Sequence, residues 1–141
     1  MNSQIRKEIV SLVEKAKVIY VSSIHEGFPN TKAMLSLQHE GMNTHYFSTN
    51  TSSKRVGQFR QNPNACIYFS DNDNFMGLML IGNMEVCTDR EHREMLWRDG
   101  FEMYYPKGID DEDYCVLKFT AFKGNYYHGL ANTSFEMEEL N

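Results

Sequence analysis

The spacing of apolar residues divides the chain into helices and strands. Residues 3–17 are predicted to form an amphipathic helix, which Asn2 or Ser3 can cap. Its apolar residues recur at helical spacing, namely Ile5, Ile9, Leu12, Val13 and Ala16. Runs of β-branched and aromatic residues, or alternation of polar and apolar ones, then predict strands. The expected strands are residues 18–24, 31–38, 44–48, 65–70, 75–87, 114–121 and 125–130.

Two further helices are expected between these strands. One covers residues 53–61 and is stopped by Asn62 and Pro63. The other opens at the capping box Thr88–Glu91 and runs to about Arg98. Residues 100–113 are expected to form a surface loop, and the acidic tail at 136–140 to be helical or frayed.

Glycines inside the predicted strands indicate where the backbone bends or turns. Gly77 and Gly82 lie within the strand at 75–87, which is typical of a bulge or of a bend at a barrel corner. Lys123 and Gly124 are expected to form the turn between the last two strands. With hairpin-length connections, this order predicts an α+β fold: one antiparallel β-barrel domain, residues 1–141, with flanking helices.

Charge and cysteine usage exclude several classes of protein. The chain has 14 Lys and Arg against 19 Asp and Glu, a net charge of −5, so neither nucleic acid nor an anionic membrane is an expected partner. The polar N-terminus is no signal peptide, and no stretch of 18 apolar residues exists. Three widely spaced cysteines exclude a disulfide framework and a zinc ribbon. A cytoplasmic location is therefore expected.

The hydroxyl-rich turn Thr49–Arg55 is the strongest candidate for a binding site. A helix start offers free N–H groups, and Ser53, Lys54 and Arg55 add a hydroxyl and two charges, which suits a phosphate. Lys32 stands on a strand expected to pair close to this turn. The alternative is a capped helix with a solvated basic first turn, although cations there oppose the helix dipole unless an anion compensates.

The other titratable residues give no comparable signal. The five histidines, at positions 25, 39, 45, 92 and 128, lack ligand spacing, so each is expected at the surface or in a turn and no metal site is predicted. Cys66, Cys87 and Cys115 are expected to be buried as small apolar residues. No side chain stands out as a general acid or base, so the catalytic residues are unknown.

Several short motifs resemble the pyridoxamine 5′-phosphate oxidase-like family of FMN-binding split barrels, and most of all its short general-stress-protein branch. The resemblance covers about residues 5–130. Its motifs, in order, are Gly27-Phe28-Pro29-x-x-Lys32-x-Met34, Tyr46-Phe47-Ser48-Thr49-Asn50-x-x-Ser53-Lys54-Arg55, Asn62-Pro63, Gly82-Asn83-Met84-Glu85-Val86 and Tyr105-Pro106-x-Gly108 before Asp113-Tyr114.

The resemblance implies an antiparallel split barrel that forms a homodimer with FMN at the subunit interface. It implies that Lys32, Ser53, Lys54 and Arg55 bind the phosphate and that Ser48 and Thr49 contact the flavin. The backbone of Lys32, Ala33, Met34 and Leu35 would border the isoalloxazine edge. Among the cations, we expect Lys54 and Lys32 to contribute most and Arg55 less.

Departures from the family pattern favour flavin binding over oxidation of pyridoxamine phosphate. Leu37 and Gly77 replace a lysine and a glutamine of the oxidases, and their C-terminal tryptophan and Arg-x-His segment has no match. The resemblance thus implies an FMN-dependent oxidoreductase whose small-molecule substrate and electron donor the sequence does not name. The alternatives are a flavin-binding module without turnover, a relative that binds deazaflavin or haem, and a structural dimer with an empty barrel.

Overall fold

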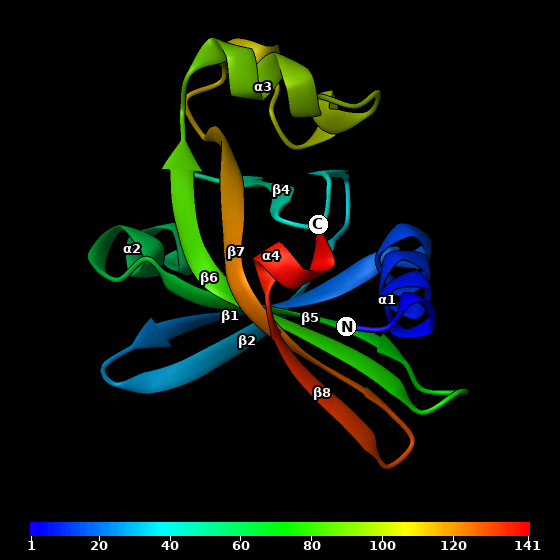
Figure 1. Cartoon of the computed structure of the whole chain (residues 1–141). Coiled ribbons are helices and arrows are strands. Elements are labelled where there is room, and N and C mark those ends of the chain that lie inside the picture. Colours follow the sequence, from blue (N-terminus) through cyan, green and yellow to red (C-terminus); the bar gives the residue numbers. More distant parts are fainter.

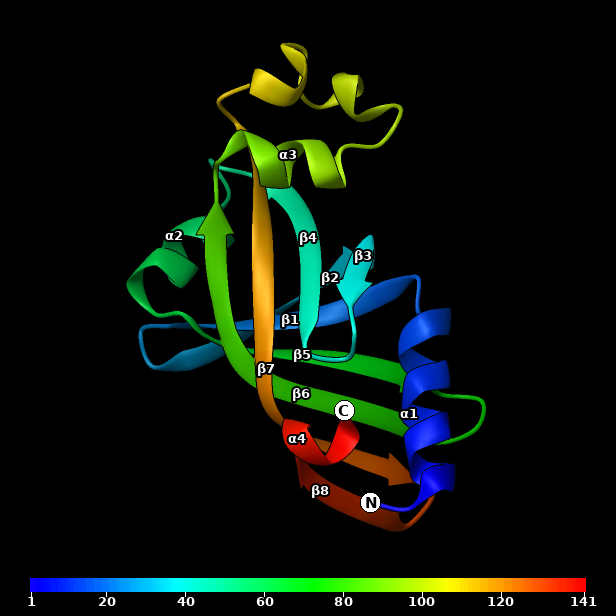
Figure 2. The ribbon, with the colours of Figure 1, turned by 45° about the horizontal axis from the view of Figure 1, so that its top comes forward.

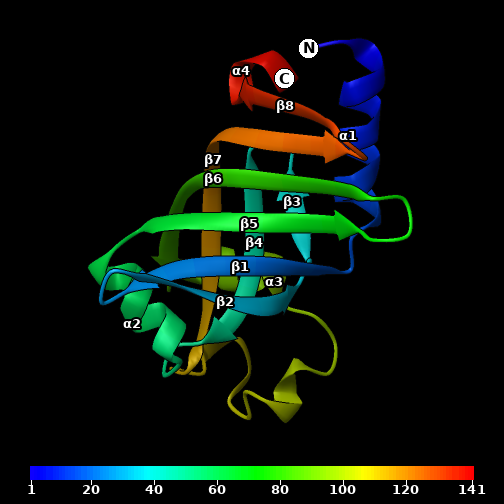
Figure 3. The same cartoon turned by 90° about the horizontal axis from the view of Figure 1, so that it is seen from below.

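The N-terminal helix α1 (Ser3–Lys15) forms where the apolar spacing predicts it. The computed structural model describes residues 1–141. The Asn2 side chain caps α1 by accepting a hydrogen bond from the Ile5 amide at 2.8 Å. Ile9, Leu12 and Val13 are buried on one face of the helix. Figure 3 shows α1 lying across the ends of the central strands, so this face closes one end of the sheet.

Eight strands form one antiparallel sheet that does not close on itself. They are β1 (Val18–His25), β2 (Phe28–Leu35), β3 (Gln38–Glu40), β4 (Thr44–Asn50), β5 (Asn64–Asp71), β6 (Met76–Cys87), β7 (Tyr114–His128) and β8 (Ala131–Glu136). The strand order is β2-β1-β5-β6-β7-β4-β3, with β8 paired to β7. This architecture, seen in Figure 1, confirms the predicted α+β split barrel.

Three more helices flank the sheet: α2 (Lys54–Gln61), α3 (Arg90–Leu96) and α4 (Met137–Leu140). The predicted loop at 100–113 contains two short 3-10 turns, Phe101–Met103 and Gly108–Asp110. Figure 2 shows α3 and this segment at one end of β4, β6 and β7, with α1 and α4 towards the other end. None of the helices is both long enough and apolar enough to cross a membrane.

The predicted turn at Lys123 and Gly124 is wrong. β7 runs unbroken from Tyr114 to His128, and the hairpin lies at Gly129, whose φ of +60° favours glycine. A Cβ on Gly124 would lie 2.7 Å from Cζ of Phe135 and 2.8 Å from the Met79 carbonyl oxygen. Gly124 is therefore required by close packing within the strand. The residues after the true hairpin form β8.

The expected bend in β6 is confirmed at Gly82. The pairing of β6 with β7 shifts register between Ile81 and Gly82. A Cβ on Gly82 would lie 1.9 Å from the Thr120 carbonyl oxygen, so only glycine allows the two backbones to approach this closely. Both long strands consequently curve, as Figure 2 shows, and serve both halves of the split barrel.

The predicted strand at 31–38 is divided in two. β2 ends at Leu35, β3 begins at Gln38, and the Ser36 amide between them donates to the Lys17 carbonyl at 2.9 Å. Almost every residue of β2 is exposed, with Met34 partly buried. β2 is an edge strand paired only with β1, so its outer edge is free.

The core contains one histidine that the sequence placed at the surface. His45 is 2% exposed and lies between the rings of Phe69 and Phe119. One of its ring nitrogens is 2.8 Å from the Met42 carbonyl oxygen. Burial lowers the pKa of His45 to about 4, so it is neutral near pH 7. The surface expectation for His45 is wrong because its alternating position on β4 points into the core.

Candidate functional site

A polar cavity of about 420 Å³ lies between β1, β2 and the start of α2. None of its lining side chains is hydrophobic. The lining residues are Ser23, Asn30, Thr31, Lys32, Asn50, Ser53, Lys54, Arg55 and Gln58. Three positive charges thus face one small space, and hydroxyl and amide groups surround them.

The three cations of this cavity have no protein counter-ion. Every ion pair of the chain involves other residues. The first turn of α2 contains no acidic residue, and Arg55 is partly buried, so burial lowers its pKa. Lys54, in contrast, is exposed. An unpaired cation in a shielded position is costly unless an anion compensates, so the cavity favours an anionic ligand.

Ser53 holds the start of α2 and keeps its hydroxyl proton free. Its Oγ accepts a hydrogen bond from the Val56 amide at 3.3 Å, which leaves the O–H able to donate to a ligand. The preceding loop is fixed from a distant part of the chain: Asp113 accepts from the amides of Thr51 at 2.7 Å and Ser52 at 2.9 Å. The first amides of α2 are therefore held in place beside the cavity, without partners inside the helix.

A second cavity, of about 290 Å³, adjoins the polar one and is largely apolar. The two share Lys32, Asn50 and Arg55. The remaining residues that line the apolar cavity are Ala33, Met34, Leu35, Ser48, Thr49, Phe101, Tyr104 and Tyr105. Together the cavities suit a ligand with an anionic group at one end and a flat apolar body at the other.

Two of the three aromatic residues that line the apolar cavity pack against β7, and the third is exposed. Phe101 and Tyr105 pack against Tyr114 at ring distances of 6.4 and 4.9 Å, whereas Tyr104 is 72% exposed. Burial raises the pKa of Tyr105 to about 12. Its hydroxyl stays protonated near pH 7, so it can donate a hydrogen bond but does not act as a base.

The nine residues predicted to bind the cofactor all line one or both cavities, and their role as ligands stays a prediction. They are Lys32, Ala33, Met34, Leu35, Ser48, Thr49, Ser53, Lys54 and Arg55. Sequence reasoning missed the other lining residues, which are Ser23, Asn30, Thr31, Asn50, Gln58 and the three aromatic residues at 101, 104 and 105. The family motif Tyr105-Pro106-x-Gly108 was the one signal for the aromatic segment. It did not indicate that this segment lies beside the cavity.

The expected ranking of the cations also changes. Arg55 borders both cavities and is partly buried, whereas Lys54 borders only the polar cavity and is exposed. The relative contributions of the three cations stay a prediction, and the position of Arg55 favours a larger contribution from it than the sequence indicated. Because α2 begins right after Ser53, Arg55 is its second residue and lines the apolar cavity together with residues of β2 and β4.

Two cysteines are buried as expected, and the third is half-buried. Cys87 is 4% exposed, Cys115 is fully buried and Cys66 is intermediate; all three are free thiols. Burial, followed by the charges of Glu85 and Asp89, raises the pKa of Cys87 to about 11. The thiol is therefore protonated near pH 7 and does not act as a ready nucleophile.

Comparison with known proteins gives the same fold. Residues 4–138 match the family described as "Pyridoxamine 5'-phosphate oxidase like". No functionally curated protein shows a significant match. A Clostridium acetobutylicum protein, described as related to general stress protein 26 of B. subtilis and of the pyridoxinephosphate oxidase family, is 45% identical, with a TM-score of 0.90 over 100% of both chains.

More distant structures share the architecture only. General stress protein 26 from Bacillus anthracis is 15% identical, with a TM-score of 0.75 over 92% of this chain and 98% of that one. A haem-binding protein from Mycobacterium smegmatis is 16% identical, with a TM-score of 0.77 over 99% of this chain and 61% of that one. The chain belongs to the pyridoxamine 5′-phosphate oxidase-like family, as its motifs indicated.

Proposed function

We propose that this protein binds FMN and is an FMN-dependent oxidoreductase that acts on a small molecule. One observation carries the proposal: a cavity with three unpaired cations opens into an apolar cavity, and Lys32, Asn50 and Arg55 border both. FMN has this division, with a phosphate at one end and a flat ring system at the other. The family to which the chain belongs also supports a flavin.

The phosphate would lie at the start of α2. Lys32, Lys54 and Arg55 would supply charge there, and Ser53 a hydroxyl donor, beside the free amides of the first helical turn. No carboxylate lines this cavity. The fit is therefore specific for an anion, and a flavin without phosphate would leave the three charges unpaired.

The ring system would lie in the apolar cavity. Ser48 and Thr49 would offer hydroxyl groups, the β2 backbone from Lys32 to Leu35 would border the ring edge, and Phe101, Tyr104 and Tyr105 would shield it from water. Bound flavin supplies hydride or single-electron transfer, and the protein supplies position and electrostatics. No lining side chain has the properties of a general base, so proton transfer is left to the substrate or solvent.

We also propose that the protein is a homodimer. β2 is exposed along most of its length, and Leu35 beside the apolar cavity is 62% exposed. Met103 and Tyr104, in the segment that borders the same cavity, are 82% and 72% exposed. A second copy would cover these apolar side chains and complete the walls of the site. Sedimentation should give a dimer at micromolar concentration; a stable monomer with and without FMN would contradict this.

Titration of apo-protein with FMN and with riboflavin tests the cofactor. We expect FMN to bind at least tenfold more tightly, about 1.4 kcal/mol, because riboflavin lacks the phosphate. Equal dissociation constants would remove the phosphate role of the polar cavity. The absorption spectrum of the purified protein separates flavin from haem, since a Soret band would favour a haem-binding relative.

Steady-state kinetics separates an enzyme from a binding module. If the protein turns over, oxidation of NADH or NADPH by a general electron acceptor should depend on bound FMN and stop in the apo-protein. Bound FMN without any turnover, across donors and acceptors, would favour a flavin-storing or sensing module and contradict the oxidoreductase.

A further inference from the structure

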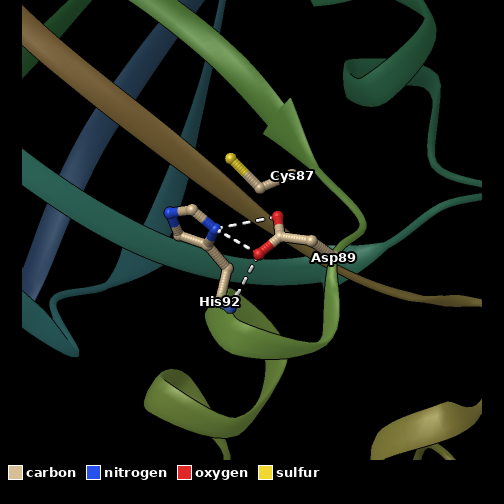
Figure 4. A group of neighbouring side chains, drawn as sticks. All are labelled: Cys87, Asp89 and His92. Atoms are coloured by element: carbon tan, nitrogen blue, oxygen red, sulfur yellow. Dashed lines mark hydrogen bonds and ion pairs between the residues drawn. The ribbon is translucent and has the colours of Figure 1, made fainter.

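The junction between β6 and α3 brings together three side chains of different donor type. Cys87 is the last residue of β6, Asp89 is the N-cap of α3 and His92 lies in the first turn of α3. Figure 4 shows the Asp89 carboxylate and the His92 imidazole facing one another, with the Cys87 side chain beside them. The sulfur, a carboxylate oxygen and a ring nitrogen all lie within 4.8 Å of one another. Nδ1 of His92 is 2.8 Å from each carboxylate oxygen of Asp89.

These distances are close to those of a metal centre. Zn–S, Zn–N and Zn–O bonds of about 2.3, 2.0 and 2.0 Å place tetrahedral ligands roughly 3.3–3.6 Å apart. The three atoms at the junction, which lie within 4.8 Å of one another, therefore have to approach by at most about 1.5 Å to share one ion. Sulfur, imidazole nitrogen and carboxylate oxygen are also the ligand types that zinc accepts together.

We propose that Cys87, Asp89 and His92 form a binding site for Zn²⁺ or a similar borderline divalent cation, with the fourth position open to water. The site is separate from the two cavities of the proposed FMN site, because none of its residues lines either of them. Its spacing, Cys-x-Asp-x-x-His, differs from the HxH and HExxH patterns, which is why the sequence alone did not indicate it.

The surroundings of the three residues favour a cation. Glu85 lies on the same face of β6, with Oε1 3.8 Å from the Cys87 sulfur, and Glu91 is in the first turn of α3. The Tyr46 ring is 6.1 Å from the His92 ring and limits its movement. Two carboxylates, Glu85 and Asp89, therefore act on the Cys87 thiol, and the one cation that acts on it is Lys118, which is paired with Glu85 across the strands.

A simpler role explains only part of the arrangement. Asp89 accepts a hydrogen bond from the His92 amide at 3.1 Å, which is an ordinary helix cap, and the carboxylate also binds the His92 ring. The cap involves only Asp89 and His92, and it gives no reason for the Cys87 thiol to lie next to them. The thiol therefore distinguishes a metal site from a cap.

The test uses tag-free protein freed of metal with a chelator. Equilibrium dialysis should give one Zn²⁺ per chain, and Co²⁺ should give a near-ultraviolet thiolate-to-metal charge-transfer band. Cys87→Ala should abolish that band and weaken Zn²⁺ binding at least tenfold, and His92→Ala should weaken it to a similar extent. Cys66→Ala, which removes a distant free thiol, is the matched control and should leave both readouts unchanged.

Asp89→Asn separates the cap from the ligand, because asparagine still caps a helix but is a poorer zinc ligand. It should weaken Zn²⁺ binding several-fold while the helical circular dichroism signal stays the same. Absence of stoichiometric binding, or a cobalt band that survives Cys87→Ala, would overturn the proposal. So would equal loss of Zn²⁺ in the Cys66→Ala control.

Discussion

The starts of α2 and α3 are capped in the same way but differ in whether their cations are balanced by acidic groups. Ser53 caps α2 and Asp89 caps α3, each accepting from an amide three residues on. The first turn of α2 holds two cations and no acid, whereas the first turn of α3 holds Arg90 and Glu91, which balance each other. Helix dipoles favour acidic residues at this end, so α3 follows the rule and α2 violates it.

The cations of the two helices also differ in their partners. Arg90 in α3 is paired with Glu94 at 2.7 Å and with Asp110 at 2.5 Å. The cations at the start of α2 have no such partner, and Arg55 among them is partly buried. The start of α3 therefore balances its own charge within the chain, and the unbalanced start of α2 supports the proposal of an anionic ligand there.

Reversing one charge at the start of α2 should have the largest effect on stability and on FMN affinity. Lys54→Glu gives α2 an acidic first turn like that of α3, so the apo-protein should become more stable by about 0.3–1 kcal/mol. FMN affinity should fall at least hundredfold, about 2.7 kcal/mol, because a carboxylate then faces the phosphate. Urea denaturation and FMN titration measure the two effects. A gain in stability without a loss of affinity would show that Lys54 has no role in binding.

Removing the cations shared by both cavities should have the next largest effect. Arg55→Ala and Lys32→Ala should each weaken FMN binding at least tenfold, about 1.4 kcal/mol, because both residues border the polar and apolar cavities. Arg60→Ala, at an exposed position in the last turn of α2, is the matched control. Bound flavin per chain at low protein concentration gives the ranking, and equal occupancy in all three variants would contradict it.

Removing each cap in turn compares the two helix starts directly. Ser53→Ala and Asp89→Ala should each lower the free energy of unfolding of the apo-protein by about 1 kcal/mol. Added FMN should then separate them. It stabilises Asp89→Ala as much as the wild type and Ser53→Ala less, since binding to the native state adds stability according to affinity. Urea denaturation with and without FMN measures this, and equal stabilisation would argue against a role for Ser53.

Acid should weaken the cap of α3 and leave that of α2 unchanged, because serine does not titrate. The His92 side chain is the main cause that lowers the pKa of Asp89. A carboxyl group with a lowered pKa stabilises the fold above its unfolded pKa of about 4, and this contribution is lost as pH falls through the folded pKa. Asp89 is half exposed, so the effect is at most about 0.5 kcal/mol.

The measurement compares wild type with Asp89→Asn by urea denaturation between pH 7 and pH 3, in the presence of chelator. The advantage of the wild type should shrink towards acid pH. Burial holds the pKa of His45 at about 4, so both proteins also lose stability below pH 6.5, and the difference between them isolates Asp89. A constant difference across the range would contradict the prediction.

Local signals in the sequence predicted most elements and failed where the cause was distant. The Ser53 cap and the buried face of α1 follow from neighbouring residues, and both are confirmed. Gly124 was predicted to lie in a turn. A glycine after a lysine gives the same local pattern whether it allows a turn or, as here, the close approach of Phe135. The contact with Phe135 depends on β8, which no local pattern places beside it.

The residues of the candidate site also fall into those that local motifs predicted and those that distant contacts place there. Residues on β2, on β4 and at the start of α2 were predicted to bind the cofactor because each lies in a short motif of the family, and they line the cavities. Phe101 and Tyr105 reach the apolar cavity because they pack on Tyr114, a contact between a loop and a strand that composition does not specify. The cluster at the β6–α3 junction was missed because its spacing matched no known ligand pattern.

The pairing of β4 with β7 has a consequence for synthesis of the protein on the ribosome. Asn50 pairs with Tyr114, and the loop before α2 is held by Asp113, so a segment far along the chain fixes the loop that borders the polar cavity. At roughly 5–20 residues per second, translation leaves β4 without this partner for several seconds. During that interval the edge of β4 that later pairs with β7 is exposed, because β3 pairs with the opposite edge, so its protection depends on chaperones.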